Sequence, residues 1–178
     1  LLFFGMIKEV KGLDILLQSF KKLIDVNPNA ILLIAGKPWK TDFSFYQDII
    51  DKNNLNDHVI LHTRFIPHAD VKYYYSASDL VVLPYKKIYQ SGVLMMALSY
   101  EKPVLVSDLP SLKEIITDNE NGFVFKSEDI NDLAKKLMLI LSDKANLERV
   151  RKNGSIVVNS EFSCNAIGTL TKQAYQTL

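Results

Sequence analysis

Short apolar runs alternate with longer stretches of helical periodicity along the whole chain, and this alternation limits the possible fold more than any other feature of the sequence. Most of the runs stay apolar on successive residues, as in ILLIA at 31–35 and DLVVLP at 79–84. A strand exposed on one face would instead alternate apolar and polar residues, so these runs fit a parallel sheet covered on both faces. The predicted strands span residues 1–4, 30–35, 59–61, 80–83, 104–107 and 122–125.

The stretches between these runs have the spacing of amphipathic helices. Residues 12–26 show it most clearly, because apolar side chains recur there three and four residues apart until Asn27 and Pro28 end the pattern. The other predicted helices span 43–52, 69–77, 92–99, 112–117, 130–141, 145–157 and 165–177. We therefore predict one α/β domain over residues 1–178, with a doubly wound, Rossmann-like, six-stranded parallel sheet, helices on both faces and two closing helices over about 145–178.

Composition excludes several classes of protein. The 21 basic and 20 acidic side chains give a net charge of +1, which offers no electrostatic case for a nucleic-acid partner. The single cysteine, Cys164, cannot form a disulfide within one chain, and no apolar run reaches the roughly 18 residues of a membrane span. We expect a cytoplasmic protein. Because the chain opens in an apolar run without methionine, we also expect it to be part of a longer protein.

The first candidate site segment is FFGMIKEVKG at residues 3–12, which joins a predicted strand to a predicted helix. Gly5 lets the backbone turn sharply beside a ligand, and the helix start offers free N–H groups. Lys8 and Lys11 add two cations, so the segment is a candidate diphosphate site. The alternative is a plain turn with two solvated lysines. Neither a P-loop nor a GxGxxG pattern is present, which disfavours a simple NTPase or a dinucleotide dehydrogenase.

The second segment runs from residue 83 to residue 108 and contains the start of an apolar helix. Ser91 is a candidate N-cap, and with Gly92 it forms a small, donor-rich surface suited to a phosphate or a sugar hydroxyl. The alternative is an ordinary capped helix whose apolar stripe only packs in the core.

The third segment, residues 62–80, places a loop at the end of a predicted strand. Arg64, Phe65 and Ile66 in this loop are candidates to frame a planar base, with Arg64 facing an anion. A metal site is not expected, because His58 and His62 straddle a strand and His68 has no cysteine or paired carboxylate nearby in the sequence.

In this order and spacing, the three segments resemble the C-terminal half of a GT-B glycosyltransferase, and the chain is similar to the family 4 group of retaining enzymes that build bacterial polysaccharides. The resemblance covers essentially the whole chain. The matching strings are FFGxIxxxKGLDxLL, LLIAGKP, RFIPxxxVxxYYxASDLVVLPY, QSGVL, KPVLVSD and NGFVF followed by DINDLAKKL.

The resemblance implies a domain that binds a nucleotide-sugar donor of UDP or GDP type, beside a separate N-terminal domain that binds the acceptor. It implies no metal or other cofactor, no activity for this domain alone, and at most a peripheral contact of the full-length protein with the inner membrane face. It assigns Gly5 and Lys11 to the diphosphate, the loop from Arg64 to Ile66 to the base, and the turn of Ser91, Gly92 and Val93 to phosphate or sugar. Gln90 would lie in the sugar or ribose region.

The sequence departs from this family in several places. Met6 stands where the family commonly has arginine, so one diphosphate cation is missing unless Lys8 replaces it. Ile88 and Met96 occupy the places of two glutamates that contact the donor sugar and the ribose. Glu114 stands where the family often has an acidic residue, and before it Pro110 and Ser111 replace small glycines.

Two alternatives stay open. One is a degenerate, non-catalytic domain used for partner docking, which would account for the missing carboxylates. The other is a nucleotide-sugar epimerase of related architecture, although such an enzyme calls for histidine and acidic groups at a domain cleft, and the sequence shows no such cluster.

Overall fold

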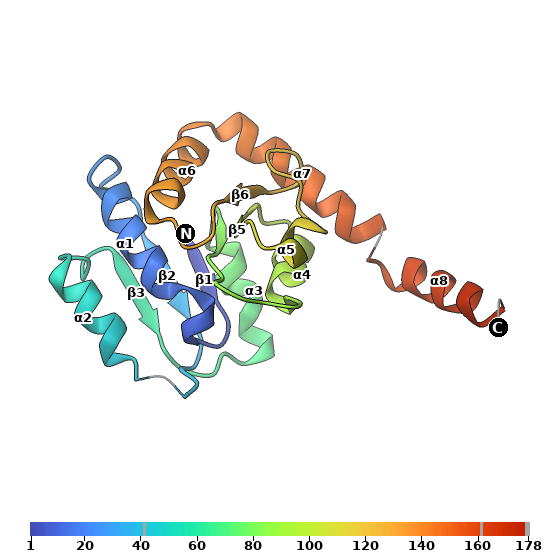
Figure 1. The fold of residues 1–178 in the computed structure, drawn as a ribbon, viewed down its shortest axis with the longest axis horizontal. Coiled ribbons are helices and arrows are strands. Elements are labelled where there is room, and N and C mark those ends of the chain that lie inside the picture. Colours follow the sequence, from blue (N-terminus) through green and yellow to red (C-terminus); the bar gives the residue numbers. More distant parts are fainter. Residues whose placement is uncertain (41, 161, 177–178) are drawn as a thin grey trace.

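A computed structural model describes residues 1–40, 42–160 and 162–176 of the chain, and a six-stranded parallel sheet forms its centre (Figure 1). The strands lie in the order β3-β2-β1-β4-β5-β6, with each neighbouring pair parallel. This confirms the predicted sheet. The chain order reverses between β1 and β4, the point at which ligands bind in open α/β sheets. The strands are β1 (Leu2–Phe4), β2 (Leu32–Ala35), β3 (Val59–His62), β4 (Val81–Leu83), β5 (Val104–Ser107) and β6 (Phe123–Phe125).

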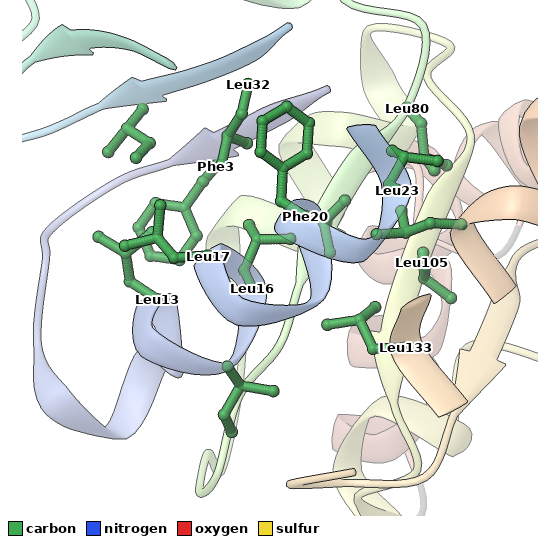
Figure 2. Close-up of a cluster of buried hydrophobic side chains, with 14 of the residues drawn as sticks. Phe3, Leu13, Leu16, Leu17, Phe20, Leu23, Leu32, Leu80, Leu105 and Leu133 are labelled. Atoms are coloured by element: carbon green, nitrogen blue, oxygen red, sulfur yellow. The ribbon is translucent and has the colours of Figure 1, made fainter. Parts of the chain in front are cut away.

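Helices cover both faces of the sheet, as the apolar strands require. Phe3 and Leu32 face α1, α2 and α6, and Figure 2 shows them packed against the apolar stripe of α1. Leu2 and Val81 face the opposite way, toward α3, α4 and α5. The helices are α1 (Leu13–Ile24), α2 (Ser44–Lys52), α3 (His68–Ser76), α4 (Gly92–Ser99), α5 (Pro110–Lys113), α6 (Ile130–Ser142), α7 (Lys144–Ser160) and α8 (Cys164–Gln176), with a short 3-10 turn at Glu9–Lys11.

The predicted helix at 112–117 is wrong in position. Pro110 occupies the first turn of α5 and follows an extended Leu109, so the helix begins earlier than predicted. It ends at Lys113, and the Asn121 side chain binds the backbone beyond that end. Its amide oxygen accepts from the Thr117 N–H and its amide nitrogen donates to the Ile115 carbonyl, both at 2.8 Å.

The last two helices, α7 and α8, follow α6, and the described residues contain no strand between them, as predicted. Helix α7 packs against α4 and α6. The α7 backbone lies close to the Asn121 carbonyl at Gly154, where an added Cβ would lie 2.8 Å from the carbonyl oxygen. Helix α8 then extends away from the body of the domain (Figure 1). Residue 177, the predicted end of this helix, lies outside the described residues.

Candidate functional site

Two glycines meet at the carboxyl ends of β1 and β2. Gly5 has φ +103° and Gly36 has φ +149°, conformations that side-chain-bearing residues rarely adopt. A Cβ on Gly36 would lie only 1.9 Å from the Gly5 carbonyl oxygen, so this contact requires glycine at position 36. Beyond the strands the two segments stay paired, because Ile7 N–H donates to the Lys37 carbonyl and Trp39 N–H donates to the Ile7 carbonyl, each at 3.0 Å.

A cavity of about 430 Å³, here called the apolar cavity, opens beside this glycine contact. Three predicted site residues line it, namely Gly5, Phe65 and Ile66, so the structure brings the first and third candidate segments together. The Phe65 ring is 74% exposed at the rim, whereas Ile66 is buried. The other lining residues are Phe4, Met6, Ala35, Gly36, Lys37, Trp39, His68, Val71 and Met96.

The start of α4 lies next to the Gly5 turn. Ser91 caps the helix as predicted, since its hydroxyl accepts from the Leu94 N–H at 3.2 Å. Val93 faces Gly5 so closely that a Cβ on the glycine would lie 3.1 Å from a Val93 methyl carbon. The second segment is therefore adjacent to the first, and a ligand at Gly5 would also meet the donors of the α4 N-terminus.

Lys11 reaches the same region through Tyr85, a residue that the sequence did not single out. The Lys11 ammonium lies 3.6 Å from the centroid of the buried Tyr85 ring. Burial, with a smaller contribution from the nearby positive charge of Lys8, lowers the pKa of Lys11 to about 8. Burial raises the pKa of Tyr85 to about 12, so the phenol stays neutral beneath the ammonium.

Tyr85 is itself held by several hydrogen bonds and by the residue that follows it. Its carbonyl accepts from the Ser107 hydroxyl at 2.7 Å and from the Ser127 hydroxyl at 3.3 Å. The next residue, Lys86, forms an ion pair of 2.8 Å with Asp14 at the start of α1. These contacts fix the loop after β4 against the segment that carries Lys11.

The remaining predicted cations lie elsewhere. The Lys8 ammonium lies 5.9 Å from the centroid of the Trp39 ring. Arg64 is exposed and does not line the apolar cavity, although Phe65 and Ile66 beside it do. The loop thus presents its apolar residues, and not its guanidinium, to the cavity.

Gln90 and Glu114 do not share the apolar cavity. They line a second cavity of about 610 Å³ between the start of α4, α5 and α8, together with Ser91 and Gly92. Phe162 and Ile167 form its side nearest α8. Gln90 and Glu114, the predicted sugar or ribose region, therefore line a different cavity from Phe65 and Ile66.

Met96 and Ile88 stand at the two places where the family has glutamate. Met96 lines the apolar cavity, whereas Ile88 is partly buried against the part of the core that contains α4. Gly36, Trp39 and Met96 were not predicted as site residues. Gly36 carries the same signal as Gly5, a glycine directly after an apolar strand, and this signal identifies it in the sequence. Trp39 carries no comparable signal, and Met96 is marked only by the resemblance, as a residue that stands in the place of a glutamate.

Two other features are absent from the described part of the chain. No three histidine, cysteine or acidic side chains gather there in a way that would hold a metal ion. Within the same residues, no helix combines the length and the apolar character needed to cross a membrane.

The sequence of residues 1–156 matches the family model described as glycosyl transferases group 1. The chain belongs to this family. Among similar proteins, the capsular polysaccharide biosynthesis glycosyltransferase CapM of Staphylococcus aureus is 26% identical over 174 residues, covering 97% of this chain and 44% of CapM. The GDP-mannose:glycolipid 4-beta-D-mannosyltransferase of Xanthomonas campestris pv. campestris is 29% identical over 175 residues, covering 98% of this chain and 48% of that enzyme. The chain spans about half the length of these relatives.

Solved structures show the same fold in other group 1 and related transferases. The C-terminal domain of LpcC, a glycosyl transferase group 1 family protein of Francisella tularensis, superposes with a TM-score of 0.83 at 20% identity, covering 92% of this chain and 85% of that one. Anabaena HepE in complex with UDP superposes with a TM-score of 0.85 at 18% identity, covering 98% of this chain and 48% of HepE. The predicted fold, the C-terminal half of a GT-B transferase, is confirmed.

Proposed function

We propose that this chain is the donor-binding half of a glycosyltransferase, and that the full-length protein transfers a sugar from a nucleoside-diphosphate sugar to a glycan or lipid-linked acceptor. An N-terminal domain would bind the acceptor, and reaction would take place in the cleft between the two domains with retention at the sugar carbon, as in the family 4 enzymes that the chain resembles. By itself the chain would bind the donor without turning it over. The full-length protein would work in the cytoplasm, with at most a peripheral membrane contact.

The single observation that carries this proposal is the convergence at the switch point of the sheet. The Gly5 turn lines the apolar cavity and lies against Val93 in the first turn of α4. The Ser91 cap of that helix and the Lys11 ammonium both lie against Tyr85. A diphosphate at the helix start would meet N–H groups and a cation, while the nucleoside would enter the apolar cavity. The UDP bound to HepE, whose fold is the same, supports this reading.

The chemistry needed from such a site is electrostatic. Negative charge grows on the nucleoside diphosphate as it leaves the sugar, and preorganised donors and cations lower the energy of that transition state. Lys11 and the α4 N-terminus would supply this stabilisation, with the neutral Tyr85 ring holding the ammonium in place. We propose that no metal takes part.

Calorimetric titration of the 178-residue chain with UDP and GDP tests the proposal. Lys11→Ala should weaken binding about 10- to 100-fold, the range expected for a lost charge-assisted hydrogen bond. Phe65→Ala should weaken it about tenfold, because an aromatic side chain that stacks on a base contributes on that scale. No binding of any nucleoside diphosphate to the folded protein would refute the proposal.

Tyr73→Ala is the matched control for Phe65→Ala. Tyr73 is 63% exposed on α3 and does not line the apolar cavity, so its removal deletes a comparable aromatic surface away from the site. For Tyr73→Ala we expect nucleotide affinity to stay within about twofold of the parent value. An equal loss of affinity in both variants would show that the loss of any exposed aromatic side chain weakens binding, and that Phe65 does not stack on the base.

A second candidate function is partner docking by a non-catalytic domain. Two observations favour it: no carboxylate is among the described residues that line the apolar cavity, and α8 exposes Ile167, Leu170 and Tyr175. Assays of the full-length protein with nucleotide-sugar donors separate the two functions, because a docking domain would give neither transfer nor donor hydrolysis.

A further inference from the structure

The apolar cavity offers little to the hydroxyl groups of a ribose. Seven of the side chains around it are carbon-rich and have no strong hydrogen-bond acceptor; they are Phe4, Met6, Ala35, Phe65, Ile66, Val71 and Met96. Lys37 and Trp39 carry nitrogen, but an ammonium and an indole N–H only donate. Among the described lining side chains, His68 alone can accept a hydrogen bond from a hydroxyl.

Two backbone carbonyls at the cavity edge already accept hydrogen bonds within the fold. The Ala35 carbonyl already accepts from the Gly5 N–H at 2.9 Å, and the Lys37 carbonyl accepts from the Ile7 N–H at 3.0 Å. The Gly5 carbonyl faces Gly36 at the distance that excludes a Cβ. The Ala35 and Lys37 carbonyls thus already serve the fold.

A ribose presents two neighbouring hydroxyls, and nucleotide sites commonly bind them with a carboxylate. A hydroxyl that loses water without gaining a partner lowers affinity by about 5- to 150-fold. A 2′-deoxyribose avoids this loss for one of the two hydroxyls, and would present carbon to the thioether of Met96.

The aromatic residues at the rim of the apolar cavity add a preference among nucleotide bases. Phe65 and Trp39 are 74% and 49% exposed beside the cavity, so a planar base entering it passes aromatic surface, with Met6 and Val71 among the apolar residues further around the wall. A methyl group on the base would be buried against such a wall, and each buried methyl or methylene carbon raises affinity about fourfold.

We propose that the donor nucleotide of this chain is a thymidine-type diphosphate sugar, which has a 2′-deoxyribose and a methylated pyrimidine. This inference rests on the proposed donor-binding function and narrows it. The sugar hydroxyl and the base methyl contribute separately, because they would contact different parts of the cavity wall.

Four nucleotides test the two contributions independently: UDP, 2′-deoxy-UDP, ribothymidine 5′-diphosphate and dTDP. In calorimetric titrations of the 178-residue chain, removal of the 2′-hydroxyl should raise affinity at least fivefold for either base. The 5-methyl group should raise it about fourfold for either sugar, so dTDP should bind about 20-fold more tightly than UDP.

The possible failures are distinct. Measurable binding of UDP or GDP that equals or exceeds that of dTDP would overturn the inference and leave the donor-binding function in place. No binding of any of these diphosphates would overturn both.

Met96 provides a variant that should reverse the preference. Met96 is only partly buried on α4, so a carboxylate at this position can reach both the cavity and water. Met96→Glu should bring the affinity for UDP to or above that for 2′-deoxy-UDP, because it supplies the missing acceptor. Met96→Leu, which keeps the wall apolar, should retain the preference for 2′-deoxy-UDP.

If Met96→Glu does not fold, as judged by circular dichroism, Met96→Gln supplies a neutral acceptor at the same place. An unchanged ratio of UDP to 2′-deoxy-UDP affinity in a folded acceptor variant would contradict the inference.

Discussion

The Lys11 ammonium lies 3.6 Å from the centroid of the Tyr85 ring, which joins the segment after β1 to the segment after β4 across the reversal point of the sheet. The Tyr85 hydroxyl also lies 3.5 Å from the Ser91 hydroxyl. One buried phenol therefore contacts a cation and a helix cap that are both candidate phosphate ligands. Because the cation–π contact holds the Lys11 ammonium in place before any ligand binds, the side chain loses less conformational entropy on binding.

The first prediction concerns pH. Because burial lowers the pKa of Lys11 to about 8, the ammonium loses its proton as pH rises from 7 to 9, while the diphosphate keeps its full charge. UDP affinity should therefore fall across this range toward the value for Lys11→Ala, which should itself be nearly independent of pH. Calorimetric titration at four pH values measures the effect.

Lys11→Arg provides the control for this pH dependence, because a guanidinium stays charged throughout. The variant should bind UDP with nearly equal affinity at pH 7 and pH 9. A wild-type affinity that is equally flat would show that Lys11 does not contact the diphosphate, or that it keeps its proton.

The second prediction separates the ring of Tyr85 from its hydroxyl. Tyr85→Phe keeps the aromatic surface under the ammonium and should change UDP affinity by no more than about twofold. Tyr85→Leu removes the quadrupole and frees the Lys11 side chain, so affinity should fall about 3- to 10-fold. Titrations at 15 °C, with folding verified by circular dichroism, compare the two, and equal effects would contradict a positioning role for the ring.

The sequence could predict the sheet because its strands are buried on both faces. A run such as ILLIA at 31–35 has few alternatives to a covered parallel strand, and the observed β2 is its central part. The sequence could also predict the turn at Gly5 and the cap at Ser91, because a single glycine after a strand or a single serine before a helix indicates such a feature.

The contact between Lys11 and Tyr85 could not be predicted from the sequence in the same way. These residues are far apart in the sequence, and Tyr85 looks like any aromatic residue after a buried strand until the fold brings it under the ammonium. The division of the site into two cavities was missed for the same reason. Gln90 is adjacent to Ser91 in the chain, yet the turn into α4 directs it toward α5 and α8 and away from the glycine contact.

The third prediction concerns the glycine contact. Gly36→Ala would place a methyl group 1.9 Å from the Gly5 carbonyl oxygen in a backbone conformation that alanine rarely adopts. Strain of this kind costs about 1–3 kcal/mol, and the displaced carbonyl adds to it. Urea unfolding should show a loss of at least about 2 kcal/mol, together with weaker UDP binding.

Gly168→Ala is the matched control, because the Cβ position of Gly168 on α8 has no heavy atom within 4 Å. This substitution should leave stability unchanged or raise it by up to about 1 kcal/mol through the better helix propensity of alanine. Equal behaviour of the two alanine variants would contradict the close approach of β1 and β2.

The fourth prediction tests why α5 ends where it does. Asn121 is 7% exposed, and its side chain binds both the Thr117 N–H and the Ile115 carbonyl. Asn121→Ala leaves both backbone groups without these partners, and each such group costs about 1–3 kcal/mol when it stays buried. We expect urea unfolding to show a loss of at least about 2 kcal/mol. Asn121→Asp keeps an acceptor for Thr117 but sets a carboxylate oxygen against the Ile115 carbonyl oxygen, so it should also be destabilised at neutral pH. A loss below about 0.5 kcal/mol in the alanine variant would mean that water replaces the side chain.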